Sequence, residues 1–332
     1  MENINKTAII LASYGSPESK DDLPEYLREV FNGRDPPEFA VLDTQKKYAI
    51  VNYISPSGQI IRDLRDELEK MMKTETKLKD VQIVNAFKHW KPSLVETIRI
   101  FAENKVERIK ILPLFPLRGR SIYDSYMQPV NEYVSMNNLN ITTELISGIC
   151  LQKSFKDIWK TNISSVLREG DYLLFTAHSL PKPKSEEELY IRDLENNSRD
   201  IAGELGCKNY GTGFQSRGPY GKIWLEPGIY DTLDKVKDAG YRRIVSAPIG
   251  FMYDHLEILY DLDILFAEKV RSYGMEYARA ESPNNNEHMV KLLFSLIVFA
   301  TQFPCYISAV ILKILNIQFL FSFGFWQAVG SK

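Results

Sequence analysis

A histidine that follows a predicted strand is the residue with the clearest capacity for chemistry. The apolar run of residues 171–174 predicts a buried strand, and Phe175-Thr176-Ala177-His178-Ser179-Leu180-Pro181 leads from it into a proline-marked loop. Ligands of open α/β sheets bind at the carboxyl ends of strands. Because an imidazole titrates near neutral pH, His178 could accept a proton or bind a metal there. A core histidine bonded to the backbone is the alternative explanation.

Acidic residues in a second segment could act together with this histidine. Asp254 is a predicted helix N-cap, followed by His255 and by Glu257 and Asp261, which lie four residues apart on one helical face. Acidic helix faces are usually solvated, but apolar neighbours predict that this helix is packed. One imidazole and one carboxylate can bind a divalent metal and leave positions open. Two ligands are too few for a permanent structural site, so the pattern favours a metal that is passed on.

Alternating strands and helices must position these side chains. Amphipathic or acid-led segments predict helices, for example over residues 22–31 and 59–72. The predicted strands cover residues 7–12, 81–87, 107–112, 141–146, 171–174 and 244–249. This alternation is typical of parallel sheets with right-handed crossovers.

The order of the segments repeats along the chain. Three pairs correspond: residues 8–17 with 172–181, 84–88 with 211–215, and 108–114 with 243–249. Aligning the prolines of the first pair places Tyr14 opposite His178. We therefore predict an α/β fold of two similar doubly wound (Rossmann-like) parallel-sheet domains that face each other across a cleft. The predicted units are residues 1–149, residues 150–291 with His178 and Glu257, and an apolar tail over residues 292–332.

Composition excludes several classes of function. The 332 residues suffice for one large or two medium domains, and a net charge of −2 gives no reason to expect nucleic acid as a partner. Cys150, Cys207 and Cys305 form neither a disulfide framework nor a cysteine metal site. A cytoplasmic location fits this pattern, and the N-terminus does not resemble a signal peptide. No Gly-x-Gly-x-x-Gly follows the first strand, so a dinucleotide is not predicted.

With these motifs the sequence resembles the ferrochelatases, the enzymes that insert ferrous iron into a porphyrin in haem biosynthesis. The resemblance extends over residues 7–287. It rests on residues 175–181 and 254–261, on Phe214-Gln215-Ser216-Arg217 with Trp224-Leu225, and more weakly on residues 54–56 and 88–89. It implies a chelatase-like fold and an enzyme without an organic cofactor, whose substrates are a porphyrin and Fe²⁺.

The resemblance also assigns roles to the residues singled out above. It implies that His178 and Glu257 form the catalytic and metal-binding pair and face each other across the porphyrin. Metallation requires that two ring N–H protons leave, and a neutral His178 is expected to accept them. Glu257, with Asp261 behind it, is expected to carry protons away or to help desolvate the incoming iron.

The first half resembles the family branch that uses coproporphyrin III. Members of that branch carry a tyrosine at the position of Tyr14, and this tyrosine reaches the metal from the face opposite the histidine. Lys47, Ser55 and Tyr126 lie where the resemblance places contacts to porphyrin carboxylates. Coproporphyrin III is therefore the expected substrate, and protoporphyrin IX is the alternative.

The basic run that binds propionates in close relatives is depleted here. Two arginines of those relatives are replaced by Phe31 and Asn32, and only Arg34 remains. Arg118 and Arg120 are the cations that could compensate for this loss.

Two further departures from the family pattern concern the backbone and the acidic helix. Asn52 and Tyr53 replace a pair of glycines before the Ser-Pro motif. Leu265 stands where relatives often have a third carboxylate, which weakens the expectation of an outer metal site.

Two other functions are compatible with the same residues. A non-catalytic haem or tetrapyrrole carrier would use His178 or Tyr14 as an axial ligand, but would not need Glu257 and Asp261 beside the ring. A chelatase for cobalt or nickel would often carry more histidines than the four in this chain.

The composition changes after residue 287. Residues 292–312 are uncharged and mostly apolar, and they are long enough to span a bilayer. A membrane anchor, an extra packed helix pair and an altered C-terminus are three explanations of the tail. Because the candidate site residues all precede residue 287, a chain that ends near Lys291 is expected to stay soluble and active.

Overall fold

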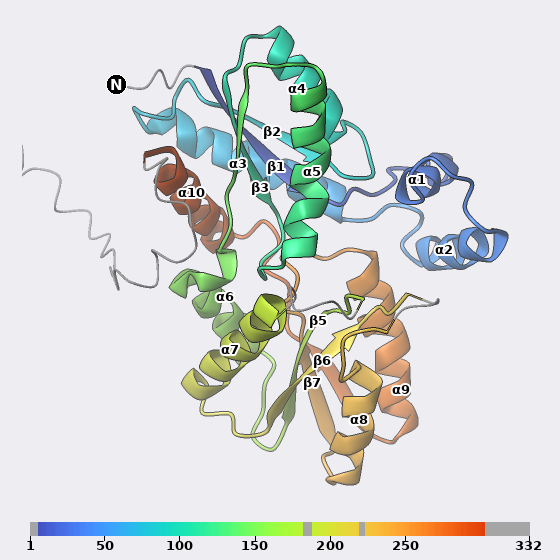
Figure 1. Ribbon diagram of the computed structural model, residues 1–332. Coiled ribbons are helices and arrows are strands. Elements are labelled where there is room, and N and C mark those ends of the chain that lie inside the picture. The colour runs from blue at the N-terminus through green and yellow to red at the C-terminus, as the bar shows by residue number, and fades with distance from the viewer. Residues whose placement is uncertain (1–5, 182–187, 219–222, 303–332) are drawn as a thin grey trace, which may run out of the picture.

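Two parallel four-stranded sheets form the framework of the protein (Figure 1). The computed structural model describes residues 6–181, 188–218 and 223–302. The first sheet has the order β2-β1-β3-β4, with β1 (Thr7–Ser13), β2 (Gln82–Phe87), β3 (Arg108–Pro113) and β4 (Thr142–Leu145). The second has the order β6-β5-β7-β8, with β5 (Tyr172–His178), β6 (Tyr210–Gln215), β7 (Arg243–Ala247) and β8 (Glu276–Arg279). The shared order confirms the α/β fold of two similar halves.

The helices cover both faces of each sheet. The first half contains α1 (Leu23–Val30), α2 (Glu38–Ile50), α3 (Ser57–Thr74), α4 (Leu94–Glu103) and α5 (Arg120–Met136). The second half contains a short 3₁₀ turn (Ile149–Leu151), α6 (Lys153–Ser164), α7 (Glu188–Glu204), α8 (Ile229–Asp238), the π-helix η4 (Glu257–Phe266), α9 (Ala267–Ser272) and α10 (Glu287–Gln302). Helix α2 has no counterpart among the predicted elements, because Tyr48 is its single buried residue and no apolar stripe marks it.

Burial explains why the central strands read as continuous apolar runs. All seven residues of β1 are buried, as are the five central residues of β5. Strands covered by helices on both faces have no solvent side, so they show no polar alternation. On α3, by contrast, Ile61, Leu64 and Leu68 form the stripe at helical spacing that packs on the sheet.

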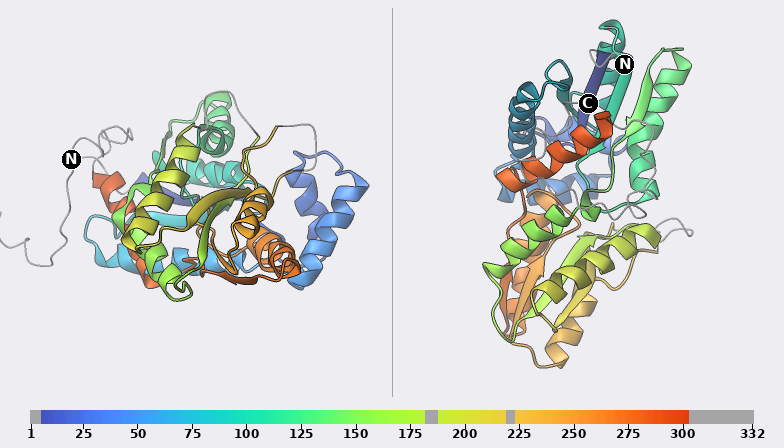
Figure 2. Two further views of the ribbon diagram at one scale, coloured as in Figure 1. Left: turned by 90° about the horizontal axis from the view of Figure 1, so that it is seen from below. Right: turned by 90° about the vertical axis from the view of Figure 1, so that its left-hand side faces the viewer.

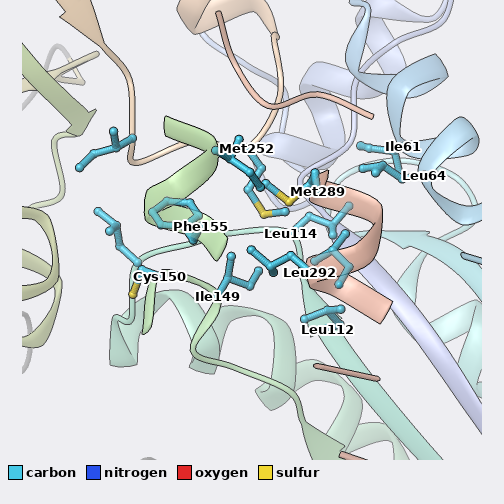
Figure 3. Packing of buried hydrophobic residues seen from close by; sticks show 14 of the residues in the cluster. Ile61, Leu64, Leu112, Leu114, Ile149, Cys150, Phe155, Met252, Met289 and Leu292 are labelled. Atoms are coloured by element: carbon cyan, nitrogen blue, oxygen red, sulfur yellow. The ribbon is translucent and has the colours of Figure 1, made fainter. Parts of the chain in front are cut away.

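One hydrophobic core runs through both halves. Each sheet has a private cluster on one face, under α4 and α5 in the first half and under α8, η4 and α9 in the second. A third cluster joins the halves, as Figure 3 shows. It brings together Leu64 of α3, Leu114 after β3, Phe155 of α6, Met252 after β7 and Met289 of α10. The halves therefore share a core in addition to their private clusters.

Helix α10 closes the structure by packing on both halves. It contacts α3 of the first half and α6 of the second, and Figure 2 shows it beside the helices of the first half. Its residues Leu292, Leu293 and Ile297 are buried in the shared core. The expected boundary at residue 291 thus falls inside a packed helix, and residues 292–302 belong to the fold.

The expected membrane contact of the tail finds no support in the described residues. None of the helices in residues 6–181, 188–218 and 223–302 is long and apolar enough to cross a bilayer. Residues 303–332, the remainder of the proposed anchor, lie outside the described residues.

Candidate active site

His178 is fixed at the carboxyl end of β5 by its own backbone. Its carbonyl oxygen accepts a hydrogen bond from the Tyr190 hydroxyl at 2.8 Å, and its Nδ1 lies 2.6 Å from the carbonyl oxygen of Ser179. A carbonyl can only accept, so Nδ1 carries a proton and Nε2 is the nitrogen available for chemistry. That nitrogen lies 3.2 Å from Oε1 of Glu257.

Glu257 begins the π-helix η4 and lies between two imidazoles. Its Oε2 is 3.5 Å from Nε2 of His255, on the side away from His178. Its backbone carbonyl accepts a hydrogen bond from the Gln215 amide at 3.2 Å, and Gln215 in turn accepts one from the Thr176 hydroxyl at 2.8 Å. The end of β6 therefore holds the start of η4 in place beside β5.

The short distance between His178 and Glu257 corrects one implication of the family resemblance. Atoms 3.2 Å apart leave no room for a porphyrin ring between them. The two side chains thus lie on the same side of any bound ring, rather than facing each other across it.

Their electrostatic coupling also corrects the expected charge of the histidine. Burial lowers the pKa of His178, but attraction to the Glu257 carboxylate and the hydrogen bonds to Glu257 and Ser179 outweigh it and raise this pKa to about 9. Burial raises the pKa of Glu257, and the two histidines more than reverse this and hold it well below its usual range. Without substrates, the pair is therefore an imidazolium and a carboxylate near neutral pH, not a neutral imidazole.

Asp261 lies behind Glu257, as the sequence predicts. Its carboxylate accepts a hydrogen bond from the Ser216 hydroxyl. Burial and the nearby charge of Glu257 raise its pKa, although Ser216 and Lys47 act in the opposite direction. Glu257 and Asp261 thus form a short acidic row along η4, and Leu265 ends it.

Asp254 does not cap the following helix, which begins only at Glu257. Its carboxylate instead accepts hydrogen bonds from the Ser282 hydroxyl at 2.7 Å and from the Arg279 guanidinium at 3.1 Å. Its backbone N–H donates to Asn284 at 2.8 Å. Asp254 therefore holds the loop that carries His255 in place through its hydrogen bonds to Arg279, Ser282 and Asn284, and not by capping the helix.

Tyr14 approaches the pair from the first half. It follows β1 directly, its ring centroid lies 4.6 Å from that of His89, and its side chain is 45% exposed. Desolvation raises the pKa of its hydroxyl, and the Glu257 carboxylate raises it further, so the two groups share one electrostatic environment. Tyr14, the residue predicted opposite His178, therefore lies within electrostatic range of Glu257.

Lys47 also links the two halves. Its Nζ pairs with Asp43 of α2 at 2.8 Å and lies 5.7 Å from the ring centroid of Tyr260 in η4. Burial lowers its pKa, but Asp43 and the charge of Asp261 raise it overall. Helix α2 thus points a cation at the acidic row of η4.

The remaining residues that are expected to contact the substrate differ in how deeply they are buried. Ser55 is buried, and its hydroxyl lies 2.9 Å from that of Ser57, which is 3.1 Å from that of Ser16. Tyr126 is buried in the private cluster of the first half. Arg34 lies in the exposed turn after α1.

Arg118 does not compensate for the missing arginines. Its guanidinium binds Asp193 of α7 through Nε at 2.8 Å and through one terminal nitrogen at 2.7 Å. Arg120 pairs with Asp124 one turn further along α5. The backbone at Asn52 and Tyr53 has positive φ values of 52° and 64°, the conformation that glycine favours. Two residues other than glycine therefore adopt a glycine-like conformation before the Ser-Pro motif.

Sequence reasoning missed two side chains that the structure places at the site. His255 was noted only as a neighbour of Glu257, yet it contacts the carboxylate. Lys88 was noted only as part of a motif, yet its ammonium lies 5.9 Å from the ring centroid of Tyr14. The signal available for Lys88 was its position immediately beyond the end of β2, at the same edge as Tyr14. For His255 it was its place two residues before Glu257.

Comparisons with known proteins identify the family of this chain. A family model described as Ferrochelatase matches residues 6–300. Ferrochelatase from Thermoplasma volcanium is 36% identical over 288 residues, which cover 87% of this chain and 91% of that protein. Coproporphyrin III ferrochelatase from Oceanobacillus iheyensis is 26% identical over 302 residues, which cover 88% and 96%.

Solved structures share the fold at low sequence identity. SirB from Bacillus subtilis with Fe³⁺ superposes with a TM-score of 0.57 at 10% identity, over 90% of this chain and 96% of that one. At this level of identity the likeness concerns the fold alone. The family match over residues 6–300 extends beyond residue 287 and includes most of α10.

Proposed function

This chain belongs to the ferrochelatase family, and we propose that coproporphyrin III is the porphyrin into which it inserts ferrous iron. The observation that carries the proposal is the position of Tyr14, whose hydroxyl shares the electrostatic environment of Glu257. The branch that uses coproporphyrin III carries a tyrosine at this position. Similarity to coproporphyrin III ferrochelatases at 26% identity supports the same substrate.

In this proposal the pair of His178 and Glu257 receives iron and manages the protons. Iron can occupy the ring only after two N–H protons have left. A divalent cation beside the pair repels the proton held on His178, because positive charge lowers the pKa of a neighbouring group. The proton on Nε2 of His178 then passes to the Glu257 carboxylate and through Asp261 to solvent. The freed Nε2 accepts one ring N–H proton and passes it along the same route before it accepts the second.

The porphyrin itself is proposed to lie between this pair and Tyr14. A site that holds a bent ring stabilises the transition state more than the flat substrate, which accelerates metallation. Lys47, Ser55 and Tyr126 are the proposed partners of its carboxylates, with Arg34 as a secondary contact. No organic cofactor enters the scheme, because the metal is a substrate.

The two alternative functions differ in what they require of the site. Membership of the ferrochelatase family disfavours a non-catalytic haem carrier. A carrier also needs no proton transfer, so it would not require the coupled pair of His178 and Glu257. Insertion of another divalent metal makes the same demands on these residues, so the choice of metal has to be measured.

Initial rates with two porphyrins test the proposal most directly. Purified protein is given Fe²⁺ with either coproporphyrin III or protoporphyrin IX, and metallation is followed by absorbance. We expect a kcat/KM for coproporphyrin III at least tenfold higher. Equal values, or a preference for protoporphyrin IX, would reject the proposed substrate. Parallel assays with Co²⁺ and Ni²⁺ identify the metal, and iron insertion slower than both would reject Fe²⁺.

A further inference from the structure

Lys88 is a cation at the proposed active site for which the described residues provide no counter-ion. It follows β2, and its backbone N–H donates to the carbonyl oxygen of Ser13 at 2.9 Å. The N–H of His89 donates in the same way to Tyr14, also at 2.9 Å. The segment of Lys88 and His89 thus continues the pairing of β1 with β2 beyond the end of the sheet, and places Lys88 beside Tyr14.

The surroundings of this ammonium contain an aromatic ring but no acid. Its Nζ lies 5.9 Å from the ring centroid of Tyr14, and no carboxylate of the described residues lies within 4.0 Å of it. Two other cations of the first half have a carboxylate partner: Lys47 pairs with Asp43, and Arg62 pairs with Glu18. Lys88 differs from Lys47, the other lysine beside the site, because no carboxylate of the described residues neutralises it.

Partial burial makes this lack of a partner significant. The side chain is half-buried, and loss of solvation lowers the pKa of its ammonium. An ammonium that has lost part of its water gains more from an arriving carboxylate than a fully hydrated one, because a charge-assisted hydrogen bond replaces the missing solvation. The position favours a bound anion.

Resting on the proposed function, we infer that Lys88 binds one carboxylate at the edge of the porphyrin substrate, beside the face that Tyr14 covers. Phe31 and Asn32 cannot bind an anion by charge, and Arg118 is engaged by Asp193. Lys88 supplies the positive charge that these positions lack, from a strand end rather than from α1. It is a binding and specificity residue, and it takes no part in proton transfer.

Two substitutions at this position separate charge from packing. Lys88→Met keeps the apolar stem and removes the charge, whereas Lys88→Arg keeps the charge. Lys237→Met is the matched control, because Lys237 also lies over a tyrosine, 4.4 Å from the ring centroid of Tyr273, but far from the site. All three variants are compared with the wild type for coproporphyrin III in the intact chain.

Porphyrin binding and steady-state kinetics give the readouts. Fluorescence titration of metal-free coproporphyrin III is expected to give a Kd about tenfold higher for Lys88→Met, within about threefold of the wild type for Lys88→Arg, and unchanged for Lys237→Met. KM is expected to follow Kd, with kcat changed by less than about threefold. An unchanged Kd in Lys88→Met, or equal weakening in Lys88→Arg, overturns the inference.

A failure of this inference can be distinguished from a failure of the proposed substrate. If the wild type prefers protoporphyrin IX, the proposed function is rejected by wild-type rates alone. The inference is then tested with that porphyrin, which also carries carboxylates, and the same ratios between the variants are expected. Loss of Lys88 without an effect on the binding of either porphyrin rejects the inference whichever substrate is preferred.

Discussion

At the scale of single residues, the site combines a histidine and a carboxylate whose charges depend on each other. The strand-end motif and the internal repeat identified His178, Glu257 and Tyr14 from the sequence. The charge state of the pair was not predictable, because it depends on a separation of 3.2 Å between residues 79 positions apart in the chain. The same holds for Lys88, because only the three-dimensional structure shows that no carboxylate of the described residues neutralises it.

Removing the histidine tests its proposed chemistry. In His178→Ala the proton acceptor is lost while the contacts to the porphyrin edge remain, so kcat should fall by at least about 100-fold with a nearly unchanged Kd for coproporphyrin III. Stopped-flow metallation and fluorescence titration measure the two quantities. His288→Ala, which changes an exposed histidine of α10, is the control. A variant that inserts iron at the wild-type rate would show that His178 has no catalytic role.

His89 should make the free energy of unfolding depend on pH. Burial, with the charge of Lys88, lowers its pKa from 6.5 to about 4, although a hydrogen bond to the carbonyl oxygen of Glu29 acts against this. Between these values the unfolded chain binds a proton that the folded chain does not, so stability is complete above pH 6.5 and decreases as the pH falls towards 4, by about 3 kcal/mol.

Urea unfolding at pH 4.5 and pH 7 measures this dependence. In His89→Gln the loss of stability on acidification should be smaller than in the wild type by about 2 kcal/mol, because the titrating group is gone. His288→Gln should keep the wild-type dependence, since its side chain is exposed in both states. Identical pH profiles for the wild type and His89→Gln would contradict the assignment.

At the scale of elements, strands were predictable and contacts of helices were not. Six of the eight described strands appear in the sequence as apolar runs, and the bounds of five of these agree with the structure within two residues. The sequence does not predict β6 or β8 as strands, and it ends β5 at Leu174 rather than at His178. Helix α2 escaped prediction because it buries little. The predicted boundary at residue 291 divides α10, because the uncharged apolar run of residues 292–312 continues past the end of this helix at Gln302. The destination of α10, between α3 and α6, follows from neither composition nor periodicity.

Two truncations separate the packed helix from the chain that follows it. Ending the chain after Lys291 removes Leu292, Leu293 and Ile297 from the shared core, and each such buried side chain contributes about 2 kcal/mol. This variant should aggregate or lose most of its stability, contrary to the expectation from sequence. A chain that ends after Gln302 keeps α10 and should remain folded and active. Soluble yield, thermal unfolding and iron insertion are the measurements, and equal stability of the two truncations would contradict the role of α10.

At the scale of the whole molecule, the two halves have the same strand order and also share a hydrophobic core. The repeat was visible in the sequence, because each half uses its apolar strands in the same order. The contacts that join the halves were not visible in the sequence, because they form between distant segments. They are the shared core and the buried pair of Arg118 and Asp193. Asp193 also accepts a hydrogen bond from the backbone N–H of Arg118 at 3.0 Å, which fixes the loop after β3 against α7.

Breaking the buried pair should destabilise the molecule as a unit. Asp193→Ala leaves the Arg118 guanidinium without a partner and should lower the free energy of unfolding by about 3 kcal/mol. The double variant with Arg118→Met and Asp193→Leu should recover part of that loss, because no unpaired charge remains. Asp157→Ala removes the partner of Lys153 in an exposed pair and should cost less than about 1 kcal/mol. Urea denaturation measures all three, and a loss for Asp193→Ala no larger than for Asp157→Ala would contradict the role of the pair.

The shared core also makes the two similar halves depend on each other. Two halves with the same strand order suggest independent modules. However, side chains of each half complete the shared hydrophobic core, so neither half covers its apolar surface alone. A chain divided at residues 147–151 would expose apolar surface on both fragments, so the fragments should be insoluble when produced separately and should regain activity only when they are produced together. In this protein the halves share a strand order, but the shared core makes each depend on the other.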